Sequence, residues 1–280
     1  MTSPRVVALL SGGGAKAAAH VGALRALTEA GLAPTHIVGT SMGAVMGACF
    51  AAGLAPDEIL ARCERVGGKG IVRSPWAPWG GLWLRSLLRG EPLHAAIGEL
   101  VPVHAFDQLT IPLTVTAVDF DSGSLVLFGA GGQSASLIDA LWASCALPVF
   151  YPPVLIGGRR LADGGLRGVV PFGAAAGVTA DLVVAIDVGP GLDEAGAPVA
   201  ASYPALIEAH NRTTGVLMAA VTMAELARWR AEPGRPELLY VRPRVEREAT
   251  FRIDRAREYA DDGYRATAAV LANREARART

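Results

Sequence analysis

The sequence predicts an α/β fold built on a parallel sheet, and three observations lead to that prediction. Residues Val6–Leu10 form a wholly apolar run, as in strands buried on both faces of a parallel sheet. Three glycines follow this run, and a stretch with helical character extends from Ala15 to Ala30. The same order recurs in His36–Gly39 and Met42–Ala52, which a short turn separates.

The remaining elements continue this alternation. Pro56 suits the first turn of a helix, Asp121–Gly123 is a turn between two apolar runs, and Pro148 follows the end of another helix. The further helices that we expect are Pro56–Val66, Pro92–Leu100, Ser136–Cys145, Tyr203–Arg230 and a charged helix from Asp254 onward. The further strands that we expect are Leu113–Asp119, Ser124–Phe128, Arg159–Ala162, Leu182–Val188 and Leu238–Arg242.

We expect a single domain, 1–280, because no linker-like stretch divides the chain. Residues from about 67 to 91 differ from the rest, since they are rich in Gly, Pro and Trp, and we interpret them as a flap inserted into the scaffold. Residues from about 203 to 280 form a mainly helical C-terminal part.

Composition excludes several classes of protein. The chain of 280 residues is 51% apolar and 19% charged, so it is not disordered. Its 26 basic and 26 acidic residues cancel, which argues against a nucleic-acid partner. Three cysteines without a CxxC pair predict neither a zinc site nor disulfides and fit a reducing compartment. No apolar run is long enough for a signal peptide or a membrane span, so we expect a cytoplasmic protein.

The pentapeptide Gly39–Gly43 fits the pattern GxSxG. It lies between a predicted strand and a predicted helix, which is the setting of a nucleophile elbow. Such a turn lifts the hydroxyl of Ser41 above the edge of the sheet, and the helix that begins at Met42 favours negative charge there. We therefore predict Ser41 as a nucleophile, the alternative being an ordinary strand-to-helix turn.

Gly12, Gly13 and Gly14 lie in another turn between a strand and a helix. Their backbone N–H groups are free of side-chain cover and can face an anion. The sequence around them departs from both the P-loop and the GxGxxG patterns, so nucleotide binding is a weaker interpretation. We favour an oxyanion site for acyl transfer, and Lys16 either adds a positive charge there or faces solvent.

The base that would activate Ser41 is less clear from the residues. None of the five histidines has a setting that aims it at a nucleophile, although His210 follows Ser41 and several Asp in the order Ser, Asp, His. Among acidic residues, Asp163 precedes two glycines, and Asp119 and Asp187 each end a predicted strand. Composition and spacing do not choose among these three.

Five segments in order resemble the patatin-like acyl hydrolases, specifically the short bacterial type. Ser11–Lys16 resembles the oxyanion loop of that family, Gly39–Gly43 its nucleophile elbow and Asp163–Gly165 its acidic motif. Phe106–Phe128 and Ala143–Val154 resemble two segments between the elbow and the acid. The resemblance covers about 6–171 and implies a three-layer fold with a mainly parallel central sheet flanked by helices.

The resemblance also implies a mechanism without histidine, metal or cofactor. Ser41 would attack an ester carbonyl, Asp163 would accept the proton, and backbone N–H groups of Gly13, Gly14 and Met42 would hold the oxyanion. The expected function is a serine acyl hydrolase (phospholipase A, lysophospholipase or carboxylesterase type) acting on lipid esters.

Two departures from the family pattern bear on this expectation. Ala17 replaces a glycine after the basic residue of the loop, and Val169 replaces an asparagine after the acidic motif. The alternatives are a general carboxylesterase or thioesterase with His210 in a triad, and an inactive protein that binds lipid or acyl chains.

Two interpretations of the flap stay open. Aromatic and basic residues together suit a lipid–water interface, so Trp76, Trp79 and Trp83 would give peripheral membrane contact. In the other interpretation, the same tryptophans bury in the core of the domain.

Overall fold

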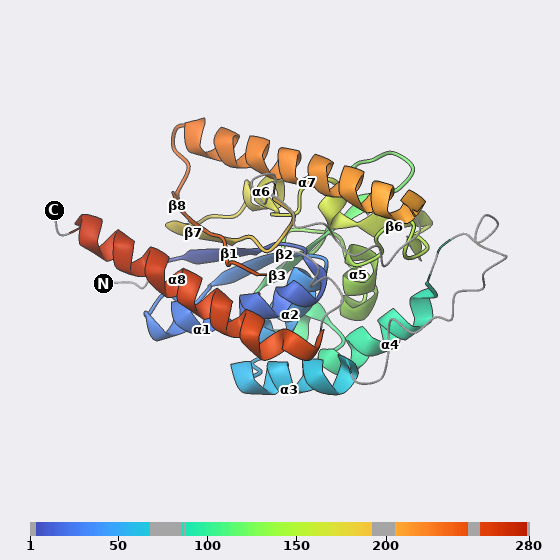
Figure 1. Ribbon diagram of the computed structural model, residues 1–280, viewed down its shortest axis with the longest axis horizontal. Coiled ribbons are helices and arrows are strands. Elements are labelled where there is room, and N and C mark those ends of the chain that lie inside the picture. The colour runs from blue at the N-terminus through green and yellow to red at the C-terminus, as the bar shows by residue number, and fades with distance from the viewer. Residues whose placement is uncertain (1–3, 68–85, 87, 192–204, 246–252, 279–280) are drawn as a thin grey trace.

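A computed structural model describes residues 4–67, 86, 88–191, 205–245 and 253–278. Within these residues, helices cover both faces of a central eight-stranded sheet, so the predicted three-layer α/β fold is confirmed (Figure 1). The strands are β1 (Val6–Leu10), β2 (His36–Thr40), β3 (Leu113–Asp119), β4 (Leu125–Gly129), β5 (Val154–Ile156), β6 (Arg159–Asp163), β7 (Leu182–Ile186) and β8 (Glu237–Val241).

The sheet has a parallel part and an antiparallel part. Strands β3, β2, β1, β7 and β8 lie side by side in that order and are all parallel. Strands β4 and β6 pair antiparallel with β3, and β5 pairs antiparallel with β6. Because the carboxyl ends of parallel strands meet at one edge of the sheet, the loops after β1, β2 and β7 are neighbours there.

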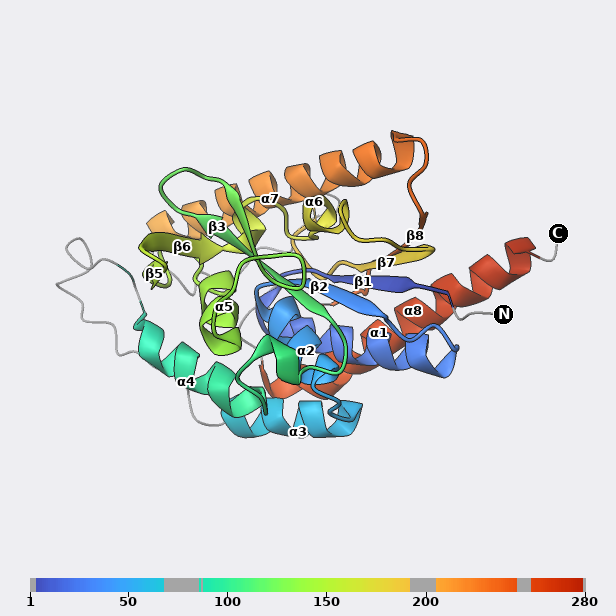
Figure 2. The same cartoon turned by 180° about the vertical axis from the view of Figure 1, so that it is seen from behind.

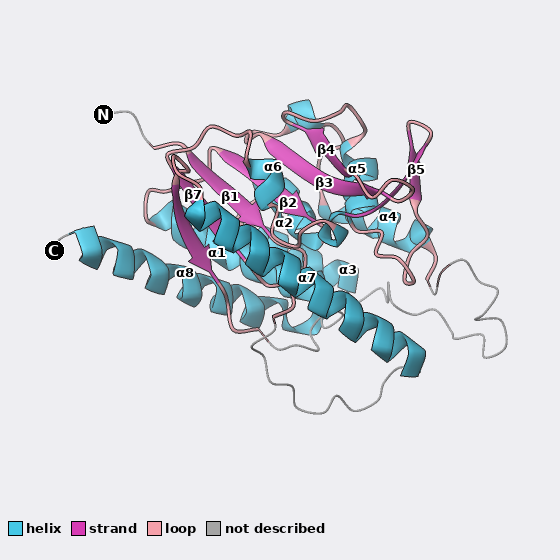
Figure 3. Ribbon diagram, turned by 90° about the horizontal axis from the view of Figure 1, so that it is seen from above, coloured by secondary structure: helices cyan, strands magenta, loops and turns pink. Residues whose placement is uncertain are grey.

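The helices form the two outer layers, with α6 and α7 on one face and α1, α2, α3 and α8 on the other (Figures 1 and 2). In the view from above, α7 crosses in front of the sheet (Figure 3). The helices are α1 (Ala18–Glu29), α2 (Met42–Ala51), α3 (Pro56–Gly67), α4 (Gly90–Leu100), α5 (Leu137–Ser144), α6 (Phe172–Ala175), α7 (Ala205–Ala231) and α8 (Ala256–Ala278).

Strand β1 shows how the apolar runs build the core. Alternate side chains of a strand point to opposite faces, so Val6, Ala8 and Leu10 join the core beneath α1 and α2. Val7 and Leu9 join a second core with Phe172 of α6 and Trp229 of α7. A strand with apolar partners on both faces must be apolar throughout, which is the pattern of Val6–Leu10.

Most of the predicted elements are confirmed within one to three residues of their bounds. The helix predicted from Ala15 begins as a 3-10 turn, η1 (Gly14–Ala17), and the helix predicted from Pro92 begins at Gly90. Strand β5 and helix α6 were not predicted, because three and four residues are too short to show a periodic pattern.

Most of the predicted flap lies outside the described residues. Trp76, Trp79 and Trp83 lie outside the described residues, so neither interpretation of the flap is tested.

The part from 203 onward contains β8 between α7 and α8, and its two helices lie on opposite faces of the sheet (Figure 1). No helix in the described ranges is long and apolar enough to cross a bilayer.

Candidate active site

Ser41 occupies a sharp turn between β2 and α2. Its φ of 53° is positive, which is rare for a residue with a side chain. The two glycines of the pentapeptide permit the turn: a Cβ on Gly39 would lie 2.4 Å from Ala44 Cα, and one on Gly43 would lie 2.3 Å from the carbonyl oxygen of Ser11. The sequence therefore builds the close packing that a nucleophile elbow requires.

The backbone of Ser41 is held by a second serine. The Ser41 N–H donates to Ser144 Oγ over 2.7 Å, and Ser144 is fully buried at the end of α5. Ser144 lies within Ala143–Val154, which resembles a segment of the family, but the sequence predicted no role for it. The only signal was its place in that segment, because its contact with Ser41 spans 103 positions of the chain.

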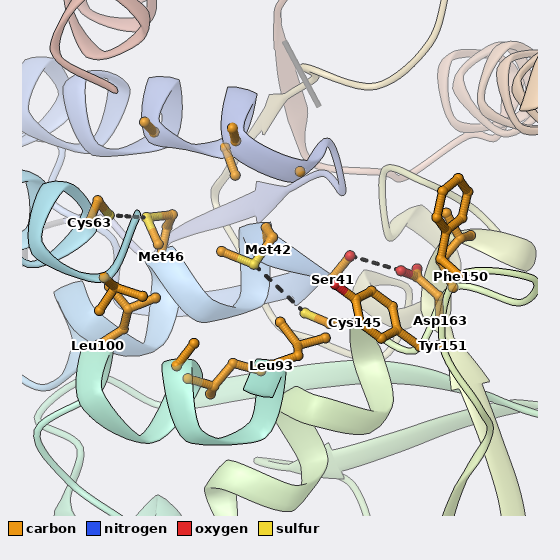
Figure 4. Close-up of a pocket in the computed structure, with 18 of the residues that line it drawn as sticks. Ser41, Met42, Met46, Cys63, Leu93, Leu100, Cys145, Phe150, Tyr151 and Asp163 are labelled. Carbon is orange, nitrogen blue, oxygen red and sulfur yellow. Dashed lines mark hydrogen bonds between the residues drawn. The ribbon is translucent and has the colours of Figure 1, made fainter. Parts of the chain in front are cut away.

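The side chain of Ser41 points at Asp163, the last residue of β6 (Figure 4). Ser41 Oγ donates to Asp163 Oδ2 over 2.8 Å, while Asp163 Oδ1 accepts the N–H of Gly165 over 2.8 Å. Both carboxylate oxygens are thus engaged, and the carboxylate is held in one orientation. This pair can pass a proton from the hydroxyl directly to the carboxylate.

Burial makes Asp163 a stronger base than an ordinary aspartate. Its side chain is 5% exposed, and desolvation raises its pKa to about 6, although the hydrogen bonds from Gly165 and Ser41 oppose this shift. At neutral pH the carboxylate is mostly charged and accepts the Ser41 proton. A base whose pKa lies close to the working pH is well matched to proton transfer.

The glycine loop lies beside Ser41. Gly12 donates its N–H to the carbonyl oxygen of Val169 over 3.1 Å, which removes it from the predicted oxyanion donors. No hydrogen bond among the described residues engages the N–H groups of Gly13 and Gly14. The candidate donors therefore narrow to Gly13, Gly14 and, at the start of α2, Met42.

Lys16 and His20, which follow the three glycines in the chain, are both buried. Lys16 is only 8% exposed, so the alternative in which it faces solvent is wrong. His20 Nε2 lies 2.8 Å from the carbonyl oxygen of Ser11, to which it donates. Desolvation lowers the pKa of this fully buried histidine to about 4, so it is neutral at pH 7 and acts as a polar anchor for the loop.

The described residues give no support to a triad. His210 Nε2 lies 3.5 Å from Thr214 Oγ1 of the same helix. No hydrogen bond joins a histidine to Ser41 or Asp163 in the part of the chain that is described.

The other two acidic candidates have different partners. Asp119 accepts the N–H groups of Asp121 and Ser122, so it caps a turn. Asp187 is paired with Arg242 over 2.7 Å. Of the three candidates that the residues left open, only Asp163 contacts Ser41.

An apolar pocket of about 160 Å³ opens beside the Ser41–Asp163 pair. It runs between α2 and α4, from Ser41 and Leu93 toward Met46 and Leu100 (Figure 4). Apart from Ser41 and Asp163, its walls are formed almost entirely by apolar side chains and sulfur atoms. The pocket offers an ester a place for its acyl chain and few partners for a polar group.

Four sulfur atoms line this pocket in two pairs. Cys145 Sγ lies 4.0 Å from Met42 Sδ, and Cys63 Sγ lies 3.9 Å from Met46 Sδ (Figure 4). Burial raises the pKa of Cys63 to about 12 and shifts that of Cys145 upward as well. Both thiols are therefore protonated at pH 7, and neither competes with Ser41 as a nucleophile.

The two departures from the family pattern occupy tight sites. Ala17 is 1% exposed in η1 and lines the pocket, so a small residue fits there. Val169 is 3% exposed, and its carbonyl oxygen holds Gly12. Because the backbone oxygen of Val169 makes this contact, the contact does not depend on an asparagine side chain at this position.

A mixed sheet with a serine elbow, a glycine loop and an acidic turn at one edge defines a patatin-type α/β protein. The patatin-like phospholipase model matches residues 9–176, and the chain belongs to that family. This match covers the elbow, the glycine loop and Asp163.

The chain is similar to the following two relatives and one solved structure. An uncharacterized NTE family protein of Mycobacterium tuberculosis is 38% identical over 187 residues, which are 66% of this chain and 49% of that protein. Patatin-like phospholipase domain-containing protein 7 of Rattus norvegicus is 29% identical over 201 residues, 68% of this chain and 14% of that protein. The crystal structure of VipD from Legionella pneumophila matches with a TM-score of 0.51 at 16% identity, over 97% of this chain and 67% of that chain.

The likeness to VipD shows the shared fold alone. The chain spans about half the length of the mycobacterial relative and a smaller share of the rat protein. These comparisons show the family and the fold of the chain.

Proposed function

We propose that this protein is a serine acyl hydrolase that cleaves carboxylic esters of lipids through a Ser41–Asp163 dyad. The observation that carries the proposal is the hydrogen bond of 2.8 Å from Ser41 Oγ to the buried Asp163 carboxylate, at one end of an apolar pocket. Membership of the patatin-like phospholipase family supports a lipid ester as the substrate class.

The reaction proceeds in two halves. Ser41 Oγ attacks the ester carbonyl, and its proton passes to Asp163 Oδ2. The carbonyl oxygen becomes an oxyanion that accepts the N–H groups of Gly13, Gly14 and Met42. The carbon–oxygen bond to the alcohol then breaks, Asp163 returns the proton to the leaving oxygen, and an acyl-Ser41 ester remains.

Water completes the cycle. It gives a proton to Asp163, attacks the acyl-Ser41 carbonyl and displaces Ser41 Oγ, which regains the proton. The acyl chain stays in the pocket through both halves, so the dyad acts twice on one bound chain. The protonated thiols and thioethers of the pocket supply no competing nucleophile.

The test is hydrolysis of nitrophenyl esters with acyl chains from acetyl to palmitoyl. We expect turnover by the parent protein and a loss of at least about 10³-fold in kcat for Ser41→Ala and for Asp163→Asn. Ser136→Ala and Asp181→Asn are matched controls, since Ser136 makes no capping hydrogen bond and Asp181 pairs with Arg5 at the far end of β7.

A second assay identifies the acyl-enzyme nucleophile. A fluorophosphonate probe labels Ser41 in the parent protein and fails to label Ser41→Ala. If folded parent protein hydrolyses no ester and takes no label, the hydrolase proposal is wrong, and saturable binding of a fatty acid would then favour the acyl-binding protein.

A further inference from the structure

Asp187 carries a buried carboxylate that no step of the proposed reaction uses. It follows β7 and is 2% exposed. Its Oδ2 accepts the Tyr240 hydroxyl over 2.5 Å and Arg242 Nη1 over 2.7 Å, and its Oδ1 accepts the N–H of Gly189 over 2.8 Å. Three donors therefore fix this one side chain.

These bonds do more than join β7 to β8. The last pair of the β7–β8 ladder is Ile186 with Val241, and Asp187 and Arg242 lie one residue beyond it. The ladder already holds the two strands in register. What the carboxylate adds is a fixed turn over residues 187–189, which the ladder does not reach.

That turn packs against the glycine loop. Val188 donates its N–H to Ser11 Oγ over 2.8 Å, in a fully buried contact. Val188 also packs against Gly13, where an added Cβ would lie 2.7 Å from Val188 Cγ2. Gly189 lies against Val169, whose carbonyl oxygen holds Gly12.

We propose that Asp187, clamped by Tyr240 and Arg242, is a positioning residue that holds the oxyanion donors of Gly13 and Gly14 in place. The inference rests on the proposed function, because it assigns the loop its role in the transition state. Asp187 acts through Val188 and Ser11 and touches no reacting atom.

A charged residue suits this task for a physical reason. Hydrogen bonds to an ionised group are about twice as strong as neutral ones, and a buried carboxylate with three donors has little freedom to move. Oxyanion donors act only when they are preorganised, and a displacement of about 1 Å costs about 10²-fold in rate.

The experiment compares Asp187→Asn and Tyr240→Phe with the parent protein. Asp187→Asn keeps the size of the side chain and removes its charge, and Tyr240→Phe removes one hydroxyl. Asp181→Asn is the matched control: Asp181 precedes the opposite end of β7 and also pairs with an arginine, Arg5, on the surface. Kinetics, inhibitor binding and backbone hydrogen exchange are measured on all four proteins.

We expect Asp187→Asn to lower kcat by about 10- to 100-fold while KM for a nitrophenyl ester stays within about threefold. Octylboronic acid, which forms a tetrahedral adduct on a nucleophilic serine, should lose affinity by a similar factor. Inhibition by 1-octanol, which needs only the apolar pocket, should not change. Tyr240→Phe should shift the same quantities in the same direction by a smaller factor, and Asp181→Asn should match the parent.

Hydrogen exchange gives a readout that does not depend on activity. The peptide containing residues 11–16 should exchange faster in Asp187→Asn than in the parent, with no change elsewhere outside 187–189 and β8. A folded Asp187→Asn with parental kcat and parental exchange in this peptide overturns the proposal. Uniformly faster exchange along the chain also overturns it, because Asp187 would then be a general stabilising residue.

The two proposals fail in different ways. If the parent hydrolyses no ester, the proposed function fails. Faster exchange of 11–16 in Asp187→Asn would still support the positioning role of Asp187. If the parent is active and Asp187→Asn is equally active, the positioning role of Asp187 is wrong and the proposed hydrolase function is unaffected.

Discussion

Thr40 and Asp163 end two strands that run toward each other along the same edge of β3. Thr40 pairs with Thr116, and Asp163 pairs with the next residue of β3, Ala117. Strand β4 occupies the opposite edge over the same stretch, so β2 and β6 meet on one side. Because Ser41 follows Thr40, its hydroxyl reaches the Asp163 carboxylate across 122 positions of the chain.

This meeting point leaves no room for a side chain on Gly164. An added Cβ would lie 2.3 Å from Thr116 Oγ1 and 2.6 Å from the Thr116 carbonyl oxygen. We therefore predict that Gly164→Ala displaces Asp163 and lowers kcat by at least about 10²-fold, with a loss of about 1–3 kcal/mol in the free energy of unfolding. Gly177→Ala is the control, since nothing lies within 4 Å of its added Cβ. Equal kcat for both variants in the ester assay would contradict the prediction.

The pH dependence of the reaction should report Asp163. The reaction needs its carboxylate form, and burial raises its pKa to about 6. We expect kcat/KM to be flat at higher pH and to fall about tenfold per pH unit below about 6. A histidine base would titrate in a similar range, so the profile is repeated with His210→Gln. An unchanged midpoint in that variant supports Asp163, and loss of activity there would favour the triad.

The same pKa shift predicts that the dyad destabilises the fold. A carboxyl group whose folded pKa exceeds its unfolded value of 3.8 stabilises the protein at low pH and loses that contribution as pH rises through about 4–6. Asp163→Asn removes the buried charge, so we expect a gain on the order of 1–3 kcal/mol in unfolding free energy at pH 7. Urea unfolding at pH 7 and pH 4.5 measures it, and the gain should shrink at the lower pH. A less stable Asp163→Asn at pH 7 would show that its hydrogen bonds outweigh desolvation.

Local signals in the sequence were sufficient for the elbow and the glycine loop. Apolar runs such as Val6–Leu10 and the glycines after them determine a strand and a turn within about ten residues, so no distant contact is needed to predict them. The same signals located Ser41 above the sheet edge. Short elements such as β5 carry too few residues for a pattern, and its place depends on pairing with β6.

The partner of Ser41 could not be derived in this way. Asp119, Asp163 and Asp187 each lie at or next to the end of a strand. The residues of each strand do not show which other strands it pairs with, so the three aspartates could not be told apart. The choice depends on how three strands pair along β3, which involves residues far apart in the chain. Resemblance to the family selected Asp163, and its geometry agrees, whereas its catalytic role stays a prediction. Ser144 was missed because its contact with Ser41 arises only when α5 packs against the elbow.

Ser144 should matter to the rate through the backbone of Ser41. Ser144→Ala removes the oxygen that accepts the Ser41 N–H. Ser41, whose φ is positive, then loses a hydrogen bond that holds its backbone in place. Leaving a buried donor unpaired costs about 1–3 kcal/mol, so we expect the elbow to relax and kcat to fall about 10- to 100-fold with KM nearly unchanged. Ser136→Ala, at the N-terminal end of the same helix, is the control in the same ester assay. Parental kcat in Ser144→Ala would show that the turn is held without this bond.

The pocket beyond Ser41 should set the preferred acyl chain length. Leu93, Ala96 and Leu100 follow one another at helical spacing on α4, and all three line the pocket. Leu93 lies nearer to Ser41 and Leu100 lies deeper in the pocket (Figure 4). Each methylene that moves from water into such a pocket contributes about 0.8 kcal/mol, or about fourfold in kcat/KM. Activity on nitrophenyl esters should therefore rise by about that factor per carbon until the pocket is filled.

Ala96→Leu tests this arrangement because it places a larger side chain midway along the wall. Short acyl chains that stop before Ala96 should react as in the parent protein. Longer chains should lose about fourfold in kcat/KM for each methylene displaced, which moves the optimum to shorter esters. Ala95→Leu is the matched control, since Ala95 is the preceding residue of α4 and is exposed. An equal chain-length profile for both variants would mean that the acyl chain binds outside this pocket, and a uniform loss at all lengths would mean that Ala96→Leu disturbs the dyad instead.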